Sequence, residues 1–174
     1  GHIRVFVAVC KTGSIKEMIY PITAVIFDID GVLLDSLSIW KKLGRRYVTR
    51  LGYPPIPGMD EILFPMSMEQ GAMWLKDRFS LEISVEEIIQ ELEREIQKFY
   101  FEEVKAKPGA EELLQKINNL GIPTAAATSS PKEHVRKALE RNHLLSHLKE
   151  IYTTSEIGES KYSPNIYLTA SEFL

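Results

Sequence analysis

The chain has 174 residues, of which 44% are hydrophobic and 26% charged, and this suits one compact soluble domain or a core domain with a smaller insertion. A net charge of −3 gives no electrostatic basis for binding nucleic acid. Cys10 is the single cysteine, which excludes an internal disulfide framework, and no apolar run approaches the ~20 residues that span a bilayer. We therefore expect a cytoplasmic protein without nucleic-acid or membrane partners.

Residues 1–17 form a leader that differs from the rest of the chain. Gly1-His2 is typical of a tag remnant, and Met18 stands just before a self-sufficient strand, which makes it a candidate natural start. The other interpretation is an atypical N-terminal extension.

The first clear element is a short apolar run over residues 24–27, typical of a strand buried on both faces of a parallel sheet. Two aspartates and Gly31 follow it, which indicates a transition from strand to loop. A helix is then predicted over residues 37–51, ended by Gly52 and a cluster of prolines.

Residues 59–105 are helical in pattern and contain no convincing strand. Ser84 and Glu87 have the spacing of a capping box at the start of the best helix. Behind this box, apolar residues recur every three or four positions and predict one packed face, formed by Val85, Ile88, Ile89, Leu92, Ile96 and Phe99.

The pattern changes at residues 107–109, where a helix begins and leads to a second apolar strand over residues 122–127. The next three residues are hydroxyl-bearing and end the strand. Ser130, Pro131 and Glu133 then predict another helix start, with a serine cap, a proline at the first position and a reciprocal acid.

A third strand is predicted over residues 151–154, and a last helix begins at Ser163. Strands thus alternate with helices, and a long helical block interrupts them after the first strand. This order favours a parallel α/β core, formed by residues 18–35 and 106–174, with a helical domain inserted at residues 36–105.

Asp28 and Asp30 follow the first strand directly, at the sheet edge where parallel α/β folds bind their ligands. Two carboxylates this close repel each other, and a bound divalent cation such as Mg²⁺ would neutralise them. One carboxylate can then attack phosphorus while the other transfers protons. A turn capped by aspartate is the alternative, and the buried strand before the pair makes it the weaker one.

Residues 27–36, FDIDGVLLDS, resemble the first signature of haloacid dehalogenase (HAD) superfamily phosphatases, particularly the β-phosphoglucomutase-like branch. The resemblance implies a Rossmann-like parallel core, with residues 36–105 as a helical cap over the substrate. It implies that Asp28 is the nucleophile and that Asp30 protonates the leaving group and later activates water. It also implies that the Asp28 side chain and the Asp30 backbone carbonyl bind Mg²⁺.

Residues 127–130, ATSS, resemble the second signature of the family, which implies that Thr128, supported by Ser129, binds the substrate phosphate. Hydroxyl and backbone N–H groups at a helix start are good donors to a phosphoryl oxygen. Lys161 has the position of the lysine in the third signature, which offsets the charge of phosphate and nucleophile. Tyr162 replaces the proline that the family usually has next to this lysine.

The fourth signature of the family, an acidic pair that completes the Mg²⁺ site, does not occur before Leu174, so we expect a truncated form of a longer protein. Such a chain should bind Mg²⁺ weakly and turn over slowly or not at all. The missing segment would also leave the strand at residues 24–27 with an open edge, which tends to pair with something. Either a leader strand over residues 5–9 or self-association with another copy would cover it.

The leading functional hypothesis is an Mg²⁺-dependent phosphatase that hydrolyses a small phosphorylated metabolite through an aspartyl-phosphate. A β-phosphoglucomutase-like sugar phosphomutase is the alternative within the family, but residues 63–70 contain no lysine or arginine to hold a second phosphate. A third alternative is a non-catalytic, truncated fragment that acts as a binding or assembly module. The sequence leaves the substrate open.

Overall fold

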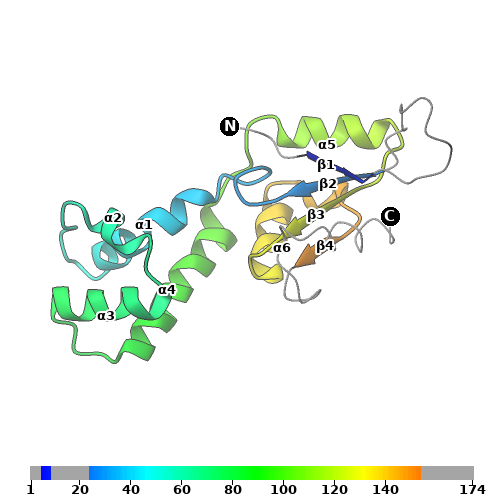
Figure 1. Cartoon of the computed structure of the whole chain (residues 1–174). Coiled ribbons are helices and arrows are strands. Elements are labelled where there is room, and N and C mark those ends of the chain that lie inside the picture. The colour runs from blue at the N-terminus through cyan, green and yellow to red at the C-terminus, as the bar shows by residue number, and fades with distance from the viewer. Residues whose placement is uncertain (1–4, 9–23, 154–174) are drawn as a thin grey trace. The chain divides into compact units, whose positions relative to one another are not determined.

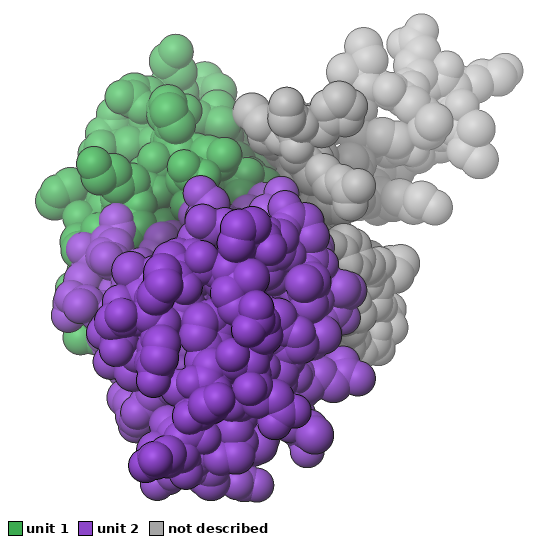
Figure 2. Space-filling view, turned by 90° about the vertical axis from the view of Figure 1, so that its left-hand side faces the viewer, with its two compact units in different colours: residues 1–35, 104–174 green, residues 36–103 purple. Residues whose placement is uncertain are grey.

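A computed structural model of the chain describes residues 5–8 and 24–153. The chain divides into two compact units, one formed by Gly1–Asp35 with Val104–Leu174 and the other by Ser36–Glu103. Figure 2 shows them in green and purple. The first unit contains the sheet and the second is helical.

The described strands form one sheet in the order β1-β2-β3-β4 (Figure 1). β2 (Ala24–Asp28), β3 (Thr124–Thr128) and β4 (Ile151–Thr153) run parallel, whereas β1 (Val5–Ala8) runs antiparallel to β2. The parallel α/β core predicted from the sequence is therefore confirmed. β3, which was predicted over residues 122–127, begins two residues later than predicted and includes Thr128.

Successive residues of β2 and β3 are buried, although neighbouring side chains in a strand point to opposite faces of the sheet. Both faces are therefore covered, as the continuous apolar run predicted. The helices α5 (Ala110–Asn119) and α6 (Lys132–Arg141) contact β3 and β4, respectively. The largest fully buried side chains of this core are Phe27, Ile26, Ile29, Leu33, Leu34, Leu114 and Leu139.

The outer edge of β2 is occupied by β1, with Val5 opposite Phe27 and Ala8 opposite Ala24. The sequence predicted that either a leader strand over residues 5–9 or another copy of the chain would pair with this edge, and in the structure the leader strand does so. β1 supplies the ladder hydrogen bonds that a bare strand edge would lack.

The helical unit consists of α1 (Leu37–Arg50), α2 (Met59–Leu63), α3 (Met68–Phe79) and α4 (Val85–Lys98), and a π-helical turn, η1 (Phe99–Glu103), extends α4. All residues of this unit are described, and they contain no strand, as predicted. The predicted helix over residues 37–51 agrees with α1 to within one residue.

Capping boxes start both α3 and α4. The predicted box of Ser84 and Glu87 is confirmed, and Ser67 forms a second box with Gln70 at the start of α3. The core of the unit lies between these helices and α1, and its buried side chains are Tyr47, Val48, Met59, Ala72, Leu75, Ile88 and Leu92.

The side chain of Leu63 on α2 packs directly against Gly44 of α1, in space that a Cβ atom at this position would occupy. Among the described helices, none is long and apolar enough to cross a membrane. Thr154 of the predicted third strand and the predicted helix from Ser163 lie outside the described residues.

Candidate active site

The candidate site begins where β2 ends at Asp28 and the chain turns back on itself. Gly31 has a φ of 78°, which glycine adopts readily, and its N–H donates to the carbonyl oxygen of Leu34 at 2.8 Å. The N–H of Leu34 in turn donates to the carbonyl oxygen of Ile29 at 3.0 Å. Because Ile29 and Leu34 are fully buried, this turn is anchored in the core and fixes the backbone of Asp30.

Asp28 lies half-buried at the carboxyl end of β2, in register with Ala127 of β3. The backbone N–H of Ile29 donates to its Oδ1 at 3.0 Å, which orients the carboxylate. Because β2 and β3 are parallel, the residues that follow them meet at the same sheet edge, where ligands of such folds bind.

Asp30 is held by two hydroxyl groups from the end of β3. The Oγ1 of Thr128 and the Oγ of Ser130 both donate to Asp30 Oδ2, at 2.8 Å and 2.9 Å. The backbone N–H of Ser130 also donates to Thr128 Oγ1 at 3.0 Å. Segments about a hundred residues apart in the sequence thus form one hydrogen-bonded cluster.

The structure therefore brings together Asp30 and Thr128, two of the residues predicted for the site, next to Asp28. Ser129 lies between Thr128 and Ser130 in the chain and is exposed to solvent. Lys161 lies outside the described residues. Ser130 is the residue that the sequence reasoning missed, because it was assigned to a helix cap.

The predicted capping role of Ser130 is wrong. α6 begins at Lys132, and the residue at its N-cap is Pro131, which makes no side-chain capping bond. Glu133, the predicted reciprocal acid, instead accepts from Arg136 at 2.7 Å. A hydrogen bond from a hydroxyl to a carboxylate is about twice as strong as one to a neutral acceptor, which explains why the Ser130 hydroxyl is directed to Asp30.

The oxygen donors at this edge suit Mg²⁺, which binds proteins through one or two carboxylates and keeps waters and substrate phosphates as its other ligands. Asp28 offers a carboxylate and Asp30 a backbone carbonyl. In the part of the chain that the structure describes, no group of three His, Cys, Asp or Glu side chains gathers to form a fuller metal site. The donor chemistry therefore fits Mg²⁺ but provides few protein ligands.

Residues 25–174 match the family of haloacid dehalogenase-like hydrolases. The chain belongs to this family. The match confirms the HAD resemblance predicted from the three short signatures, and it includes the ends of both strands that carry the candidate site.

The HAD chain is 27% identical over 151 residues to the phosphorylated carbohydrates phosphatase of Thermotoga maritima, covering 87% of this chain and 70% of that protein. It is 30% identical over 154 residues to hexitol phosphatase A of Escherichia coli, covering 86% and 67%. A solved structure from Thermotoga maritima, provisionally named a beta-phosphoglucomutase, has a TM-score of 0.74 and 26% identity, covering 84% and 68%. At the level of the family, the predicted enzyme class of phosphoric monoester hydrolases is confirmed.

Proposed function

We propose that this HAD protein is an Mg²⁺-dependent phosphatase that hydrolyses a small phosphorylated metabolite through an aspartyl-phosphate on Asp28. The observation that carries the proposal is the cluster at one sheet edge, in which Thr128 and Ser130 hold Asp30 beside the end of β2. The names of the relatives, phosphatases of phosphorylated carbohydrates and of hexitols, support phosphorylated sugars or polyols as the substrate class.

In the proposed reaction, a carboxylate oxygen of Asp28 attacks phosphorus and the bond from phosphorus to the ester oxygen breaks. Asp30 gives its proton to the departing oxygen. A water molecule then attacks the aspartyl-phosphate, and Asp30 takes up the proton of this water. Inorganic phosphate leaves and the carboxylate of Asp28 is restored.

Substrate phosphate would be bound by donors at the end of β3. Thr128 donates to Asp30 in this structure, so its hydroxyl proton must turn toward a phosphoryl oxygen when substrate binds. The hydroxyl of Ser130 then remains on Asp30 and keeps it in place. Backbone N–H groups at Ser129 and at the start of α6 add donors, and Lys161 is proposed to offset the negative charge.

Mg²⁺ would be held by the Asp28 carboxylate and the Asp30 backbone carbonyl. When bound, it supplies positive charge that lowers the repulsion between the phosphate and the attacking carboxylate. Because the described part of the chain gathers few acidic ligands here, we expect weak binding of the metal.

The helical unit, Ser36–Glu103, is proposed as the cap that selects the substrate, with the sheet unit as the catalytic core. A sugar phosphomutase is a second candidate, supported by the likeness to the Thermotoga maritima structure. Residues 63–70, LFPMSMEQ, offer no basic side chain for a second phosphate, and for this reason we place hydrolysis first.

The test is release of inorganic phosphate from sugar phosphates, polyol phosphates and a generic aryl phosphate in the presence of Mg²⁺. Asp28→Asn should abolish release and EDTA should suppress it. The matched control is Asp35→Asn, because Asp35 is an exposed acid close in sequence whose ion pair with Lys107 is 3.5 Å long.

Conversion of one sugar phosphate into its isomer without phosphate release would instead support the mutase. If neither reaction occurs and a radioactive phosphoryl donor leaves no label on the folded protein, the catalytic proposal is refuted and the binding-module alternative stands.

A further inference from the structure

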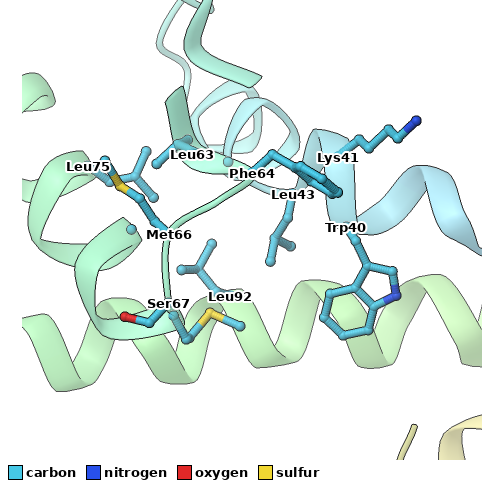
Figure 3. Close-up of a pocket in the computed structure, with 12 residues that line it drawn as sticks. Trp40, Lys41, Leu43, Leu63, Phe64, Met66, Ser67, Leu75 and Leu92 are labelled. Atoms are coloured by element: carbon cyan, nitrogen blue, oxygen red, sulfur yellow. The ribbon is translucent and has the colours of Figure 1, made fainter. Parts of the chain in front are cut away.

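A pocket of about 220 Å³ lies within the helical unit, where Leu43 of α1 faces Leu92 of α4 (Figure 3). Its walls belong to the proposed cap, so it is part of the substrate selection already proposed for that unit. The sheet unit contains a candidate of a different kind, an asparagine outside the hydroxyl cluster that hydrogen bonds connect to Asp30. This residue is Asn142, directly after α6.

The side-chain amide of Asn142 is bound at both of its ends. Its Oδ1 accepts from the backbone N–H of Ala106 at 2.9 Å. Its Nδ2 donates to the carbonyl oxygens of Val104 and Ala138, at 3.0 Å and 2.7 Å. Because the oxygen faces an N–H and the nitrogen faces two carbonyl oxygens, the amide fits in one orientation. Asn142 therefore ties the end of α6 to residues 104–106.

An ordinary helix end does not explain an asparagine at this position. Asparagine is common after a helix because it tolerates the left-handed conformation there. Here the left-handed residue is His143, with a φ of 61°, whereas Asn142 has a φ of −90°, which most residues adopt. The contacts of the side chain, rather than the conformation of the backbone, therefore require asparagine at position 142.

The segment that Asn142 holds is paired with the chain that follows the Asp30 turn. Ala106 forms an antiparallel bridge with Leu34. Two backbone hydrogen bonds flank this bridge, from the N–H of Lys107 to Leu33 at 2.8 Å and from the N–H of Asp35 to Lys105 at 2.9 Å. The position of Ala106 therefore sets the position of Leu34.

Leu34 in turn fixes the backbone on both sides of Asp30. Its carbonyl oxygen accepts from the N–H of Gly31 at 2.8 Å, and its own N–H donates to the carbonyl oxygen of Ile29 at 3.0 Å. Asp30 stands between these two residues and bridges to Leu34 itself. An unbroken series of backbone contacts thus leads from the amide of Asn142 to the turn that carries Asp30.

α6 is therefore connected to Asp30 from both of its ends. Ser130, just before α6, donates to the Asp30 carboxylate at 2.9 Å, and Asn142, just after α6, holds the backbone behind the same residue. A helix of ten residues is a stiff element about 15 Å long. The side chain of Asp30 and the turn that carries it thus depend on one rigid support.

We propose that Asn142 is a positioning residue, which fixes the turn of Asp30 by holding Ala106 against Leu34. It touches neither substrate nor metal in this role. Small displacements of a reacting group lower the rate steeply, so a loosened turn lowers kcat. The effect on kcat rests on the proposed phosphatase function, whereas the effect on the turn does not.

Two substitutions at this position separate positioning from stability. Asn142→Ala removes all three hydrogen bonds, so kcat should fall about fivefold with little change in KM. Asn142→Asp keeps an oxygen for the N–H of Ala106 but loses both donors. It should lower the urea midpoint as Asn142→Ala does and yet regain most of kcat.

Asn118→Ala is the matched control. Asn118 is also half-buried and lies in the last turn of a helix, α5. Its Nδ2 donates to the carbonyl oxygen of His147 at 3.0 Å, and its Oδ1 accepts from Thr124 at 3.2 Å. Thr124 opens β3, whereas the hydroxyl cluster follows the other end of that strand. The control should therefore lower the urea midpoint without changing kcat.

The amide NMR signal of Gly31 measures the turn directly in the ¹⁵N-labelled full chain. It should shift in Asn142→Ala, shift less in Asn142→Asp and stay in place in Asn118→Ala. This measurement needs no turnover. If the unchanged protein releases no phosphate, the proposed function fails, and the Gly31 signal still decides whether Asn142 holds the turn.

The proposal is overturned if the Gly31 signal stays in place in Asn142→Ala, or moves as far in Asn118→Ala. It is also overturned if kcat follows the urea midpoint across all three variants, since Asn142 would then act on stability alone. Should Asn142→Ala not fold, Asn142→Asp decides: a lowered midpoint with kcat retained supports positioning, and a kcat that falls with the midpoint refutes it.

Discussion

Replacing Glu95 by glutamine tests how the helical unit accommodates a buried charge. Glu95 lies on α4 and is only 4% exposed. Its Oε2 accepts from the Nε of Arg46 at 2.9 Å, and its Oε1 forms an ion pair with Arg50, so both partners come from α1. Glutamine keeps the shape and one acceptor oxygen but removes the negative charge.

The expected loss follows from the exposure of the two partners. Removing one member of a fully buried ion pair destabilises a protein by about 3–5 kcal/mol. Here the side chains of Arg46 and Arg50 are 27% and 45% exposed, so water can solvate them, and Arg46 also keeps its pair with Glu103. The loss should therefore resemble that of a hydrogen bond to a charged group, about 2 kcal/mol.

Urea unfolding followed by tryptophan fluorescence measures this loss. The chain has two tryptophans, Trp40 on α1 and Trp74 on α3, so the signal reports on the helical unit. With a slope of about 2 kcal/mol per molar urea, the midpoint should fall by about 1 M. Asp60→Asn is the control, because it breaks a more exposed pair with Arg45 that is worth about 1 kcal/mol or less. A midpoint shift for Glu95→Gln no larger than that of the control would refute the reasoning.

Two more variants test the site and the pH dependence. Ser130→Ala removes one of the two donors to Asp30, so in the proposed phosphatase kcat should fall about tenfold with little change in KM. Steady-state phosphate release measures both constants. An unchanged kcat would show that Ser130 does not position Asp30. Burial, and then a hydrogen bond to Glu91, raise the pKa of Tyr47, so the folded state favours the neutral phenol. The free energy of unfolding should therefore fall as the pH rises above about 10, where tyrosine in the unfolded chain ionises. Urea midpoints measured across this pH range should fall less for Tyr47→Phe than for the unchanged protein. An equal fall in both proteins would assign it to other groups.

Elements with a strong local signal were predictable from the sequence. The apolar run at residues 24–27 could be buried on both faces only in a covered sheet, and it became β2. The box of Ser84 and Glu87 uses hydrogen bonds between neighbouring residues, so its spacing alone located the start of α4. Both signals depend on a few adjacent residues and require no knowledge of distant contacts.

The burial of Glu95 could not be predicted in the same way. A glutamate among apolar residues of a helix normally indicates the solvent-exposed side, because a buried charge needs a partner. Its partners, Arg46 and Arg50, lie more than forty residues earlier in the chain, and no local pattern connects them to α4. The pairing partner at the edge of β2 could not be predicted either. The sequence allowed a leader strand or a second copy of the chain to cover this edge, and only the structure shows β1 there.

In the proposed reaction, the two hydroxyl donors of the segment Thr128-Ser129-Ser130 have different roles. Thr128 Oγ1 accepts the N–H of Ser130, so its oxygen stays fixed while its proton can turn from Asp30 to a phosphoryl oxygen. If Thr128 were the single donor, this turn would release Asp30 at the moment when the proposed reaction needs it in place. Ser130 donates to the same oxygen of Asp30, which would keep the carboxylate oriented while Thr128 binds phosphate in the proposed reaction. In the proposed reaction the two hydroxyls would thus separate phosphate binding from the positioning of the acid, and the phosphate-release assay on Ser130→Ala tests the positioning half of this arrangement.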